Sequence, residues 1–136
     1  MDAETIHAKI DAQVTDALKV AGPFKWQIQK DGFSIFVNMR HRRKSDHTFL
    51  LKVSFDDYPQ RAPSYVFVDG DRRTPGGWPP SVKHGSNPPG ICTPGTRECI
   101  EHYHRGDAKY QWDPNKYTLR FVLMEIQRML EKGIGG

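Results

Sequence analysis

Two cysteines and two histidines lie close together in the second half of the chain. Cys92 and Cys99 are the only cysteines among 136 residues, and His102 and His104 follow the second of them. A cysteine thiolate is a strong nucleophile and a metal ligand, and an imidazole can tune a neighbouring thiol or bind a metal. Because two cysteines seven residues apart do not make a disulfide framework, we expect either a reactive thiol or a zinc site.

The spacing of these four side chains argues against zinc. Short zinc motifs pair cysteines about two to four residues apart, whereas Cys92 and Cys99 are seven apart. His102 and His104 would point to opposite sides of a strand or a helix. We therefore interpret the histidines as exposed on a polar loop or as tuning a nearby cysteine, and we expect no bound metal and no cofactor.

The segment that carries Cys92 has little hydrophobic periodicity. Residues 69–95 are rich in proline and glycine, as in the runs 74–80 and 87–90. Long loops of this kind are uncommon in a compact domain unless they are functional. This loop is therefore the best location for a site.

Two amphipathic helices are predicted to flank the rest of the chain. Apolar residues at spacings of three and four predict a helix from about residue 3 to residue 20, which Gly22-Pro23 should end. A second helix should begin near Thr118, an N-cap residue type, and end at Gly133. Its apolar face is formed by Leu119, Val122, Leu123, Ile126 and Leu130.

Between the helices, alternating apolar residues predict an antiparallel meander. Residues 24–39 should form a hairpin that turns at Asp31-Gly32, and strands at 49–55 and 64–68 should follow. The second strand should place on one face Phe33, Ile35, Val37 and Met39. The fold class is therefore α+β: an N-terminal helix, a four-stranded antiparallel meander, a long active-site loop and a C-terminal helix. One domain over residues 1–136 suffices for a chain of this length.

Two prolines four residues apart lie between the last two strands. Each proline fixes φ and favours extended geometry in the residue before it, so Tyr58-Pro59 and Ala62-Pro63 predict a rigid crossover. Further along come Gly90-Ile91-Cys92 and then Trp112-Asp113-Pro114, which precedes the last helix. In this order of motifs the chain resembles the ubiquitin-conjugating enzymes, the thioester carriers of the ubiquitin cascade.

The resemblance implies a truncated ubiquitin-conjugating fold and a cysteine-dependent transferase. Cys92 would accept the C-terminal glycine of a ubiquitin-like protein from an activating enzyme as a thioester, and would pass it to an amine of a protein substrate. The family's His-Pro-Asn motif is replaced here by residues 84–87, so Asn87, or else His84, would hold the loop or stabilise the oxyanion. An asparagine before two prolines is also an ordinary turn residue.

An insertion separates Cys92 from Trp112, twenty residues further on. Inserted loops near the cysteine occur in carriers of other ubiquitin-like modifiers and in bacterial relatives encoded beside conjugation genes, and the chain resembles these more than a standard eukaryotic enzyme. Cys99 in the insertion competes with Cys92 as the nucleophile, but it lacks the Gly-x-Ile context. Two other interpretations stay open: a non-catalytic module that binds a ubiquitin-like protein, and a small zinc-stabilised interaction domain.

Composition argues against two other classes of partner. The net charge is +4, and its densest part, residues 40–44, is typical of a solvated hairpin tip rather than a nucleic-acid surface. No apolar run approaches the roughly 20 residues that span a bilayer. Residues 1–4 lack the features of a signal peptide, so we expect a cytoplasmic protein with no nucleic-acid or membrane partner. We interpret the terminal Gly135-Gly136 as a frayed end rather than a ligatable modifier tail.

Overall fold

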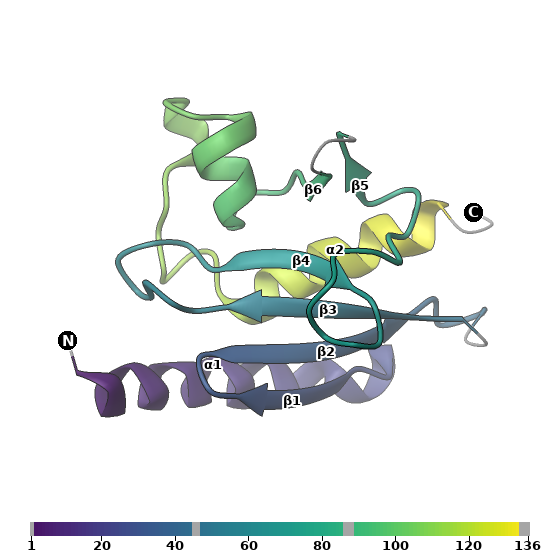
Figure 1. Ribbon diagram of the computed structural model, residues 1–136, viewed down its shortest axis with the longest axis horizontal. Helices are drawn as coiled ribbons and strands as arrows, with labels where there is room; N and C mark the ends of the chain where they lie inside the picture. Colours follow the sequence, from purple (N-terminus) through teal and green to yellow (C-terminus); the bar gives the residue numbers. More distant parts are fainter. Residues whose placement is uncertain (1, 45–46, 86–88, 134–136) are drawn as a thin grey trace.

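Two α-helices and a four-stranded sheet form the body of the protein (Figure 1). The computed structural model describes residues 2–44, 47–85 and 89–133. The helices are α1 (Ala3–Phe24) and α2 (Leu119–Gly133). The strands are β1 (Gln27–Asp31), β2 (Ser34–Arg40), β3 (Thr48–Ser54), β4 (Ser64–Val68), β5 (Lys83–His84) and β6 (Gly90–Ile91). Two short helical turns lie between β6 and α2, the π-helix η1 (Cys99–Tyr103) and the 3-10 helix η2 (Ala108–Tyr110).

The first four strands form an antiparallel meander in chain order, which confirms the predicted sheet. Asp31 pairs with Ser34, so the turn between β1 and β2 consists of Gly32 and Phe33, and Gly32 has a φ of 61°. The inner face carries fully buried side chains, namely Ile35, Val37, Met39, Leu51, Val53 and Phe67. Phe33 was expected on this face, but it lies in the turn, is 38% exposed and stacks on His7. That expectation is wrong because β2 begins only at Ser34.

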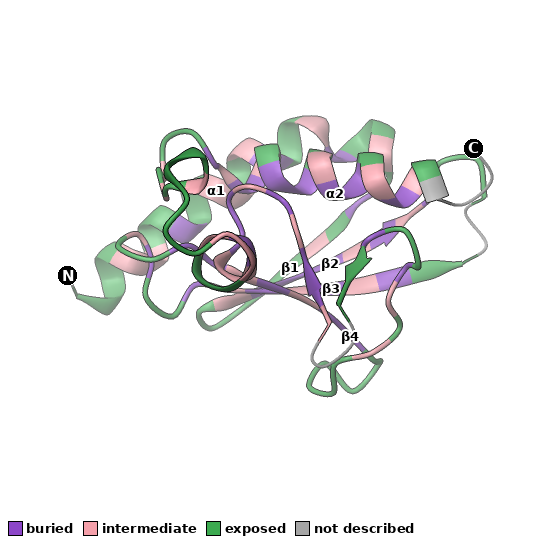
Figure 2. Ribbon diagram, turned by 90° about the horizontal axis from the view of Figure 1, so that it is seen from above, coloured by how far each residue is buried: buried purple, intermediate pink, exposed green. Residues whose placement is uncertain are grey.

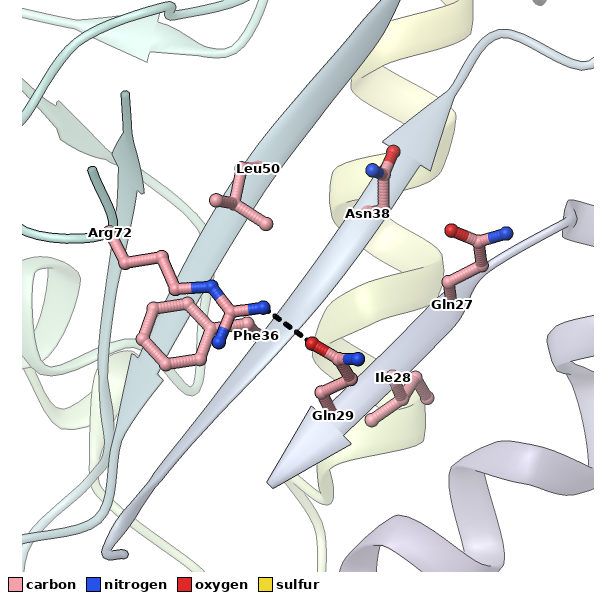
Figure 3. Close-up of a pocket in the computed structure, with 7 residues that line it drawn as sticks. All are labelled: Gln27, Ile28, Gln29, Phe36, Asn38, Leu50 and Arg72. Atoms are coloured by element: carbon pink, nitrogen blue, oxygen red, sulfur yellow. Dashed lines mark hydrogen bonds between the residues drawn. The ribbon is translucent and has the colours of Figure 1, made fainter. Parts of the chain in front are cut away.

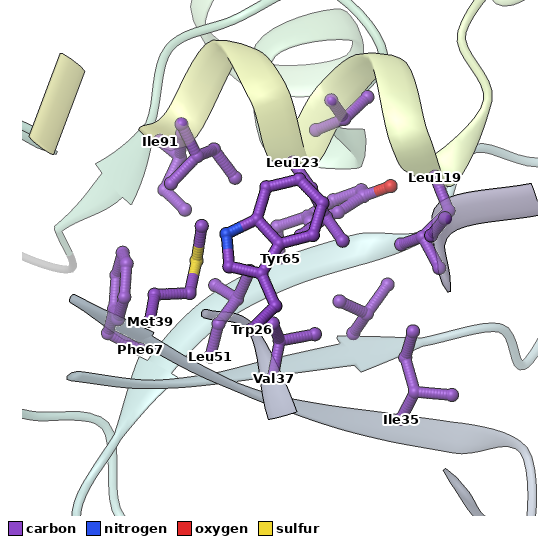
Figure 4. Packing of buried hydrophobic residues seen from close by; sticks show 14 of the residues in the cluster. Trp26, Ile35, Val37, Met39, Leu51, Tyr65, Phe67, Ile91, Leu119 and Leu123 are labelled. Atoms are coloured by element: carbon purple, nitrogen blue, oxygen red, sulfur yellow. The ribbon is translucent and has the colours of Figure 1, made fainter. Parts of the chain in front are cut away.

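Both helices cover the same face of the sheet, and α2 packs against α1 (Figure 2). The predicted apolar face of α2 is confirmed, because each of its side chains is at most 2% exposed. These side chains are Leu119, Val122, Leu123, Ile126 and Leu130. Figure 4 shows Leu119 and Leu123 of α2 facing the side chains of the strands across the core. The Thr118 hydroxyl accepts the Phe121 N–H at 3.2 Å, so Thr118 is the predicted N-cap.

The end of α1 differs from the prediction. The helix does not stop at Gly22-Pro23 but continues to Phe24. Proline removes one hydrogen-bond donor, but its fixed φ is compatible with a last helical turn. Lys25 closes the helix in a left-handed conformation with a φ of 60°, and its N–H donates to the Gly22 carbonyl at 3.0 Å. The predicted stop is therefore wrong, because the cap lies beyond the proline.

Between β4 and α2 the described residues form only short elements. β5 and β6 form a two-stranded antiparallel sheet, and η1 and η2 follow it above β4 (Figure 1). The whole is an α+β topology compatible with the ubiquitin-conjugating fold. None of the described helices combines the length and apolar character needed to cross a membrane. Asn87 and Gly135-Gly136 lie outside the described residues.

Candidate active site

Cys92 lies directly after β6, where the chain leaves the core. The preceding residue, Ile91, is fully buried, and Gly90 pairs with His84 of β5. Cys92 itself is half-buried. Strand pairing and a buried neighbour therefore fix the backbone at Cys92, while the residue stays partly exposed.

Cys99 lies in a different environment. It begins η1 and is fully buried. Burial, and after it the neighbouring Cys92, raises the pKa of the Cys99 thiol to about 12. Such a thiol stays protonated at neutral pH, whereas the thiolate is the reactive form. Of the two cysteines, Cys92 is the one that a partner protein can reach.

His104 brings an imidazole to Cys92. Its Nε2 lies 3.3 Å from the Cys92 Sγ, and its ring stacks on Tyr110 with centroids 3.8 Å apart and planes 8° from parallel. The π-helix explains this placement, because it bonds residues five apart, and the His104 N–H donates to the Cys99 carbonyl at 2.8 Å. Cys99 and His104 therefore lie on the same side of the turn. The candidate ligand atoms of Cys92, Cys99 and His104 all lie within 4.8 Å of one another.

The other predicted site residues are not part of this cluster. His102 is exposed, and its ring lies 5.0 Å from that of Tyr103. His84 is also exposed, and its ring lies 4.4 Å from that of Tyr103, edge to face. Asn87 lies outside the described residues. The structure thus brings together three of the four side chains considered for zinc and leaves His102 apart.

Thr96 connects the two cysteines. Its side chain is fully buried, and the hydroxyl lies 3.0 Å from the Ile91 carbonyl oxygen and 3.1 Å from that of Thr93. The same hydroxyl oxygen accepts the Cys99 N–H at 3.1 Å. One side chain therefore joins the end of β6 to the start of η1.

Gly95 lets this turn pack directly on α2. Its φ is 99°, a conformation that residues with a Cβ rarely adopt. A Cβ at this position would lie 2.7 Å from Val122 Cγ2 and 2.8 Å from Tyr117 Cβ. Both neighbours are buried, so neither has free space to move into. Glycine is required here for the backbone conformation and for the close approach.

We name residues 89–118 the cysteine loop. The loop is attached to the proline crossover through backbone carbonyls. Arg97 donates from its N–H to the Pro63 carbonyl at 2.9 Å and from Nε to the Ala62 carbonyl at 3.0 Å. Trp112 Nε1 donates to the Pro59 carbonyl at 2.8 Å. The proline crossover therefore serves as the base on which the cysteine loop lies.

A second attachment joins the cysteine loop to the beginning of β4. The Glu98 carboxylate accepts the Ser64 hydroxyl at 2.6 Å and the Tyr65 N–H at 3.1 Å. Further out, Arg61 and Glu101 form an ion pair at 2.6 Å, and the Arg61 hydrogen bond lowers the pKa of the Glu101 carboxyl. These contacts place η1 beside the edge strand of the sheet.

Sequence reasoning missed the residues that hold the site in place. Thr96 had a local signal, since a threonine three residues before a helical N–H is a capping pattern. Arg97 and Glu98 carry no such signal, because their partners lie more than thirty residues away in the sequence. Their roles follow only from the fold.

A pocket opens on the uncovered face of the sheet (Figure 3). Its lining consists of Gln27, Ile28, Gln29, Phe36, Asn38, Leu50 and Arg72. The Arg72 guanidinium lies 4.7 Å from the centre of the Phe36 ring and donates to the Gln29 side chain. These lining residues include no thiol, imidazole or carboxylate, so the cysteine loop is the stronger candidate for chemistry.

Comparison with known proteins adds no assignment. No protein-family model matches the chain, and a comparison with curated proteins finds no significant similarity.

Proposed function

We propose that the protein is a ubiquitin-conjugating-like carrier. Cys92 accepts the C-terminal glycine of a ubiquitin-like protein from an activating enzyme as a thioester and transfers it to an amine of a protein substrate. The observation that supports this most is the half-buried Cys92 with His104 Nε2 at 3.3 Å from its sulfur. The α+β topology and the order of motifs are consistent with such a carrier. In this proposal the protein works in the cytoplasm of a bacterium, because the insertion between Cys92 and Trp112 resembles those of bacterial relatives.

In the charging step the Cys92 sulfur attacks the activated carbonyl of the modifier. The thiol proton passes to His104, a carbon–sulfur bond forms, and the bond to the leaving group of the activating enzyme breaks. The leaving group then takes up a proton. A nearby imidazole favours this step because only the thiolate is an effective nucleophile.

In the transfer step an amine of the substrate attacks the thioester carbonyl. The amide bond forms, the carbon–sulfur bond breaks, Cys92 leaves as a thiolate stabilised by the protonated His104, and the amine passes its proton to solvent. Asn87 is the oxyanion donor that the family resemblance implies. His84 is the alternative, but its ring lies against Tyr103.

The test is to incubate the protein with its cognate activating enzyme, modifier and ATP. We expect a modifier-sized adduct that a thiol reductant removes. Cys92→Ser should give no adduct or a reductant-resistant ester, because an oxygen ester exchanges poorly with thiols, whereas Cys99→Ser should still form the labile adduct. A labile adduct lost only in Cys99→Ser would move the nucleophile to Cys99. No adduct with a verified activating enzyme would favour a non-catalytic binding module.

The role of His104 has its own test. His104→Ala should slow charging by about tenfold or more at neutral pH, because the thiol loses its base. The deficit should shrink as the pH rises and thiolate forms without help. His102→Ala changes an exposed imidazole in the same turn and serves as the matched control. A pH-independent deficit would mean that His104 acts only on the shape of the loop.

A further inference from the structure

The spacing of the cysteines and histidines predicted no metal, but the π-helix η1 brings His104 to the side of Cys99. We therefore infer that Cys92, Cys99 and His104 form a binding site for one zinc ion. Two thiols and an imidazole are a donor set that zinc prefers, and their ligand atoms all lie within 4.8 Å of one another. Ligands of a tetrahedral zinc ion lie roughly 3.5 to 3.8 Å apart, from the usual zinc–sulfur and zinc–nitrogen distances. The separation of 3.3 Å between Cys92 Sγ and His104 Nε2 is close to that value.

Each of the three ligands is held by a separate structural element. Cys92 follows β6, Cys99 is fixed through the Thr96 hydroxyl, and the ring of His104 is oriented by its stack on Tyr110. The bond from the His104 N–H to the Cys99 carbonyl couples two of the ligands directly. The three donor atoms therefore already lie near one another in the folded chain, and to bind an ion they need to move from at most 4.8 Å apart to about 3.5 to 3.8 Å apart.

The number of ligands predicts how the ion is held. Structural zinc sites are closed by four protein ligands, whereas three protein ligands leave one position for water or for another molecule. Cys92 and His104 are both half-buried and Cys99 is fully buried, so we expect solvent to reach the ion past Cys92 and His104. We therefore expect an exchangeable ion and not one on which folding depends.

Zinc at this site would also control the proposed function. A sulfur that binds zinc cannot carry an acyl group at the same time, so the ion and the modifier compete for Cys92. This second part rests on the proposed carrier function. The first part does not, because zinc binding can be measured with the protein alone.

The binding experiment uses reduced, metal-free protein titrated with Co²⁺ and, in competition with a chromogenic chelator, with Zn²⁺. We expect one ion per chain and a thiolate-to-cobalt charge-transfer absorption. Cys99→Ser and His104→Ala should each weaken zinc binding by about tenfold or more, since loss even of outer groups costs about that much. His102→Ala should bind as the parent does.

Two results would overturn the zinc site. One is the absence of the charge-transfer absorption at saturating Co²⁺, and the other is zinc affinity that neither Cys99→Ser nor His104→Ala weakens. If Cys99→Ser does not fold, the rate at which iodoacetamide alkylates Cys92 can be measured with and without Zn²⁺, in the parent and in His104→Ala. Protection should be strong in the parent and weak in the variant, and equal protection would count against the site.

The competition is tested separately in the charging assay. Zn²⁺ should block the labile adduct in the parent and in His102→Ala, and chelator should restore it. Cys99→Ser should need at least about tenfold more Zn²⁺ for the same block, which separates an effect on this protein from one on the activating enzyme. Zinc binding without any adduct would leave the site intact and refute only the carrier.

Discussion

The helix–sheet sandwich and the cysteine loop are stabilised in different ways. In the sandwich, α1, α2 and the meander bury apolar side chains that repeat at helical or strand spacing. In the cysteine loop, polar side chains such as Arg97, Glu98 and Trp112 reach backbone groups of residues 59–65. The difference indicates that apolar burial provides most of the stability, whereas polar hydrogen bonds hold the geometry of the site. Substitutions in the two regions should therefore have separable effects.

The largest effect is expected from Leu123→Ala in the sandwich. Leu123 is fully buried, and removing its side chain leaves a cavity between α2 and the sheet that should cost about 3 kcal/mol in the free energy of unfolding. Urea unfolding followed by circular dichroism measures it. Phe121→Ala on the same helix is the control, because Phe121 is 38% exposed and should cost about 1 kcal/mol or less. Equal losses would mean that burial does not distinguish the two faces of α2.

Gly95→Ala tests the place where the two regions meet. The left-handed φ and the approach to Val122 and Tyr117 should together cost about 2 kcal/mol in unfolding free energy. Gly106→Ala is the matched control, since Gly106 also has a positive φ of 82° but nothing within 4 Å of a Cβ. The excess cost at position 95 therefore measures packing on α2. No excess would show that the cysteine loop is not pressed against the helix.

Thr96→Val should act mainly on the cysteine loop. Valine keeps the volume but leaves the Ile91 carbonyl and the Cys99 N–H without their partner, at a cost of about 1 to 2 kcal/mol. We expect alkylation of Cys99 to accelerate by about tenfold in a Cys92→Ser background, because local opening becomes easier. Thr96→Ser retains the hydroxyl and should stay close to the parent. An unchanged alkylation rate in the valine variant would mean that the Thr96 hydroxyl does not keep Cys99 protected from solvent.

The smallest effect concerns a polar contact within the sandwich. Arg42 pairs with Glu131 of α2 at 2.7 Å, and this hydrogen bond lowers the pKa of the Glu131 carboxyl to about 2. Because the folded-state pKa is depressed, the stabilisation is present above the unfolded pKa of about 4.3 and is lost as the pH falls towards 2. Glu131→Gln should lower unfolding free energy by about 0.5 to 1 kcal/mol at pH 6 and by less at pH 2.5. A difference that grows in acid would contradict the pairing.

The helix–sheet sandwich could be predicted from the sequence better than the cysteine loop, because local hydrophobic period describes only the sandwich. The bounds of β4 and the buried face of α2 follow from local hydrophobic period, and both are confirmed. The end of α1 was misplaced because a cap beyond Pro23 overrides the usual stop. The sequence drew attention to Cys92, Cys99 and two histidines, but which histidine joins the cysteines could not be predicted, since spacing rules for strands and α-helices do not describe a π-helix. In that turn His104 comes to the side of Cys99, where an α-helical period would not place it.

The cysteine loop docks on main-chain atoms of the proline crossover. The acceptors at Pro59, Ala62 and Pro63 are main-chain carbonyls, which every amino acid possesses. What the cysteine loop needs from the crossover is the path of its backbone. Homologous chains can therefore exchange the side chains there while keeping the contact, provided that the replacements preserve the turn. In such chains the path of the backbone would be conserved, although no pair of residues would be.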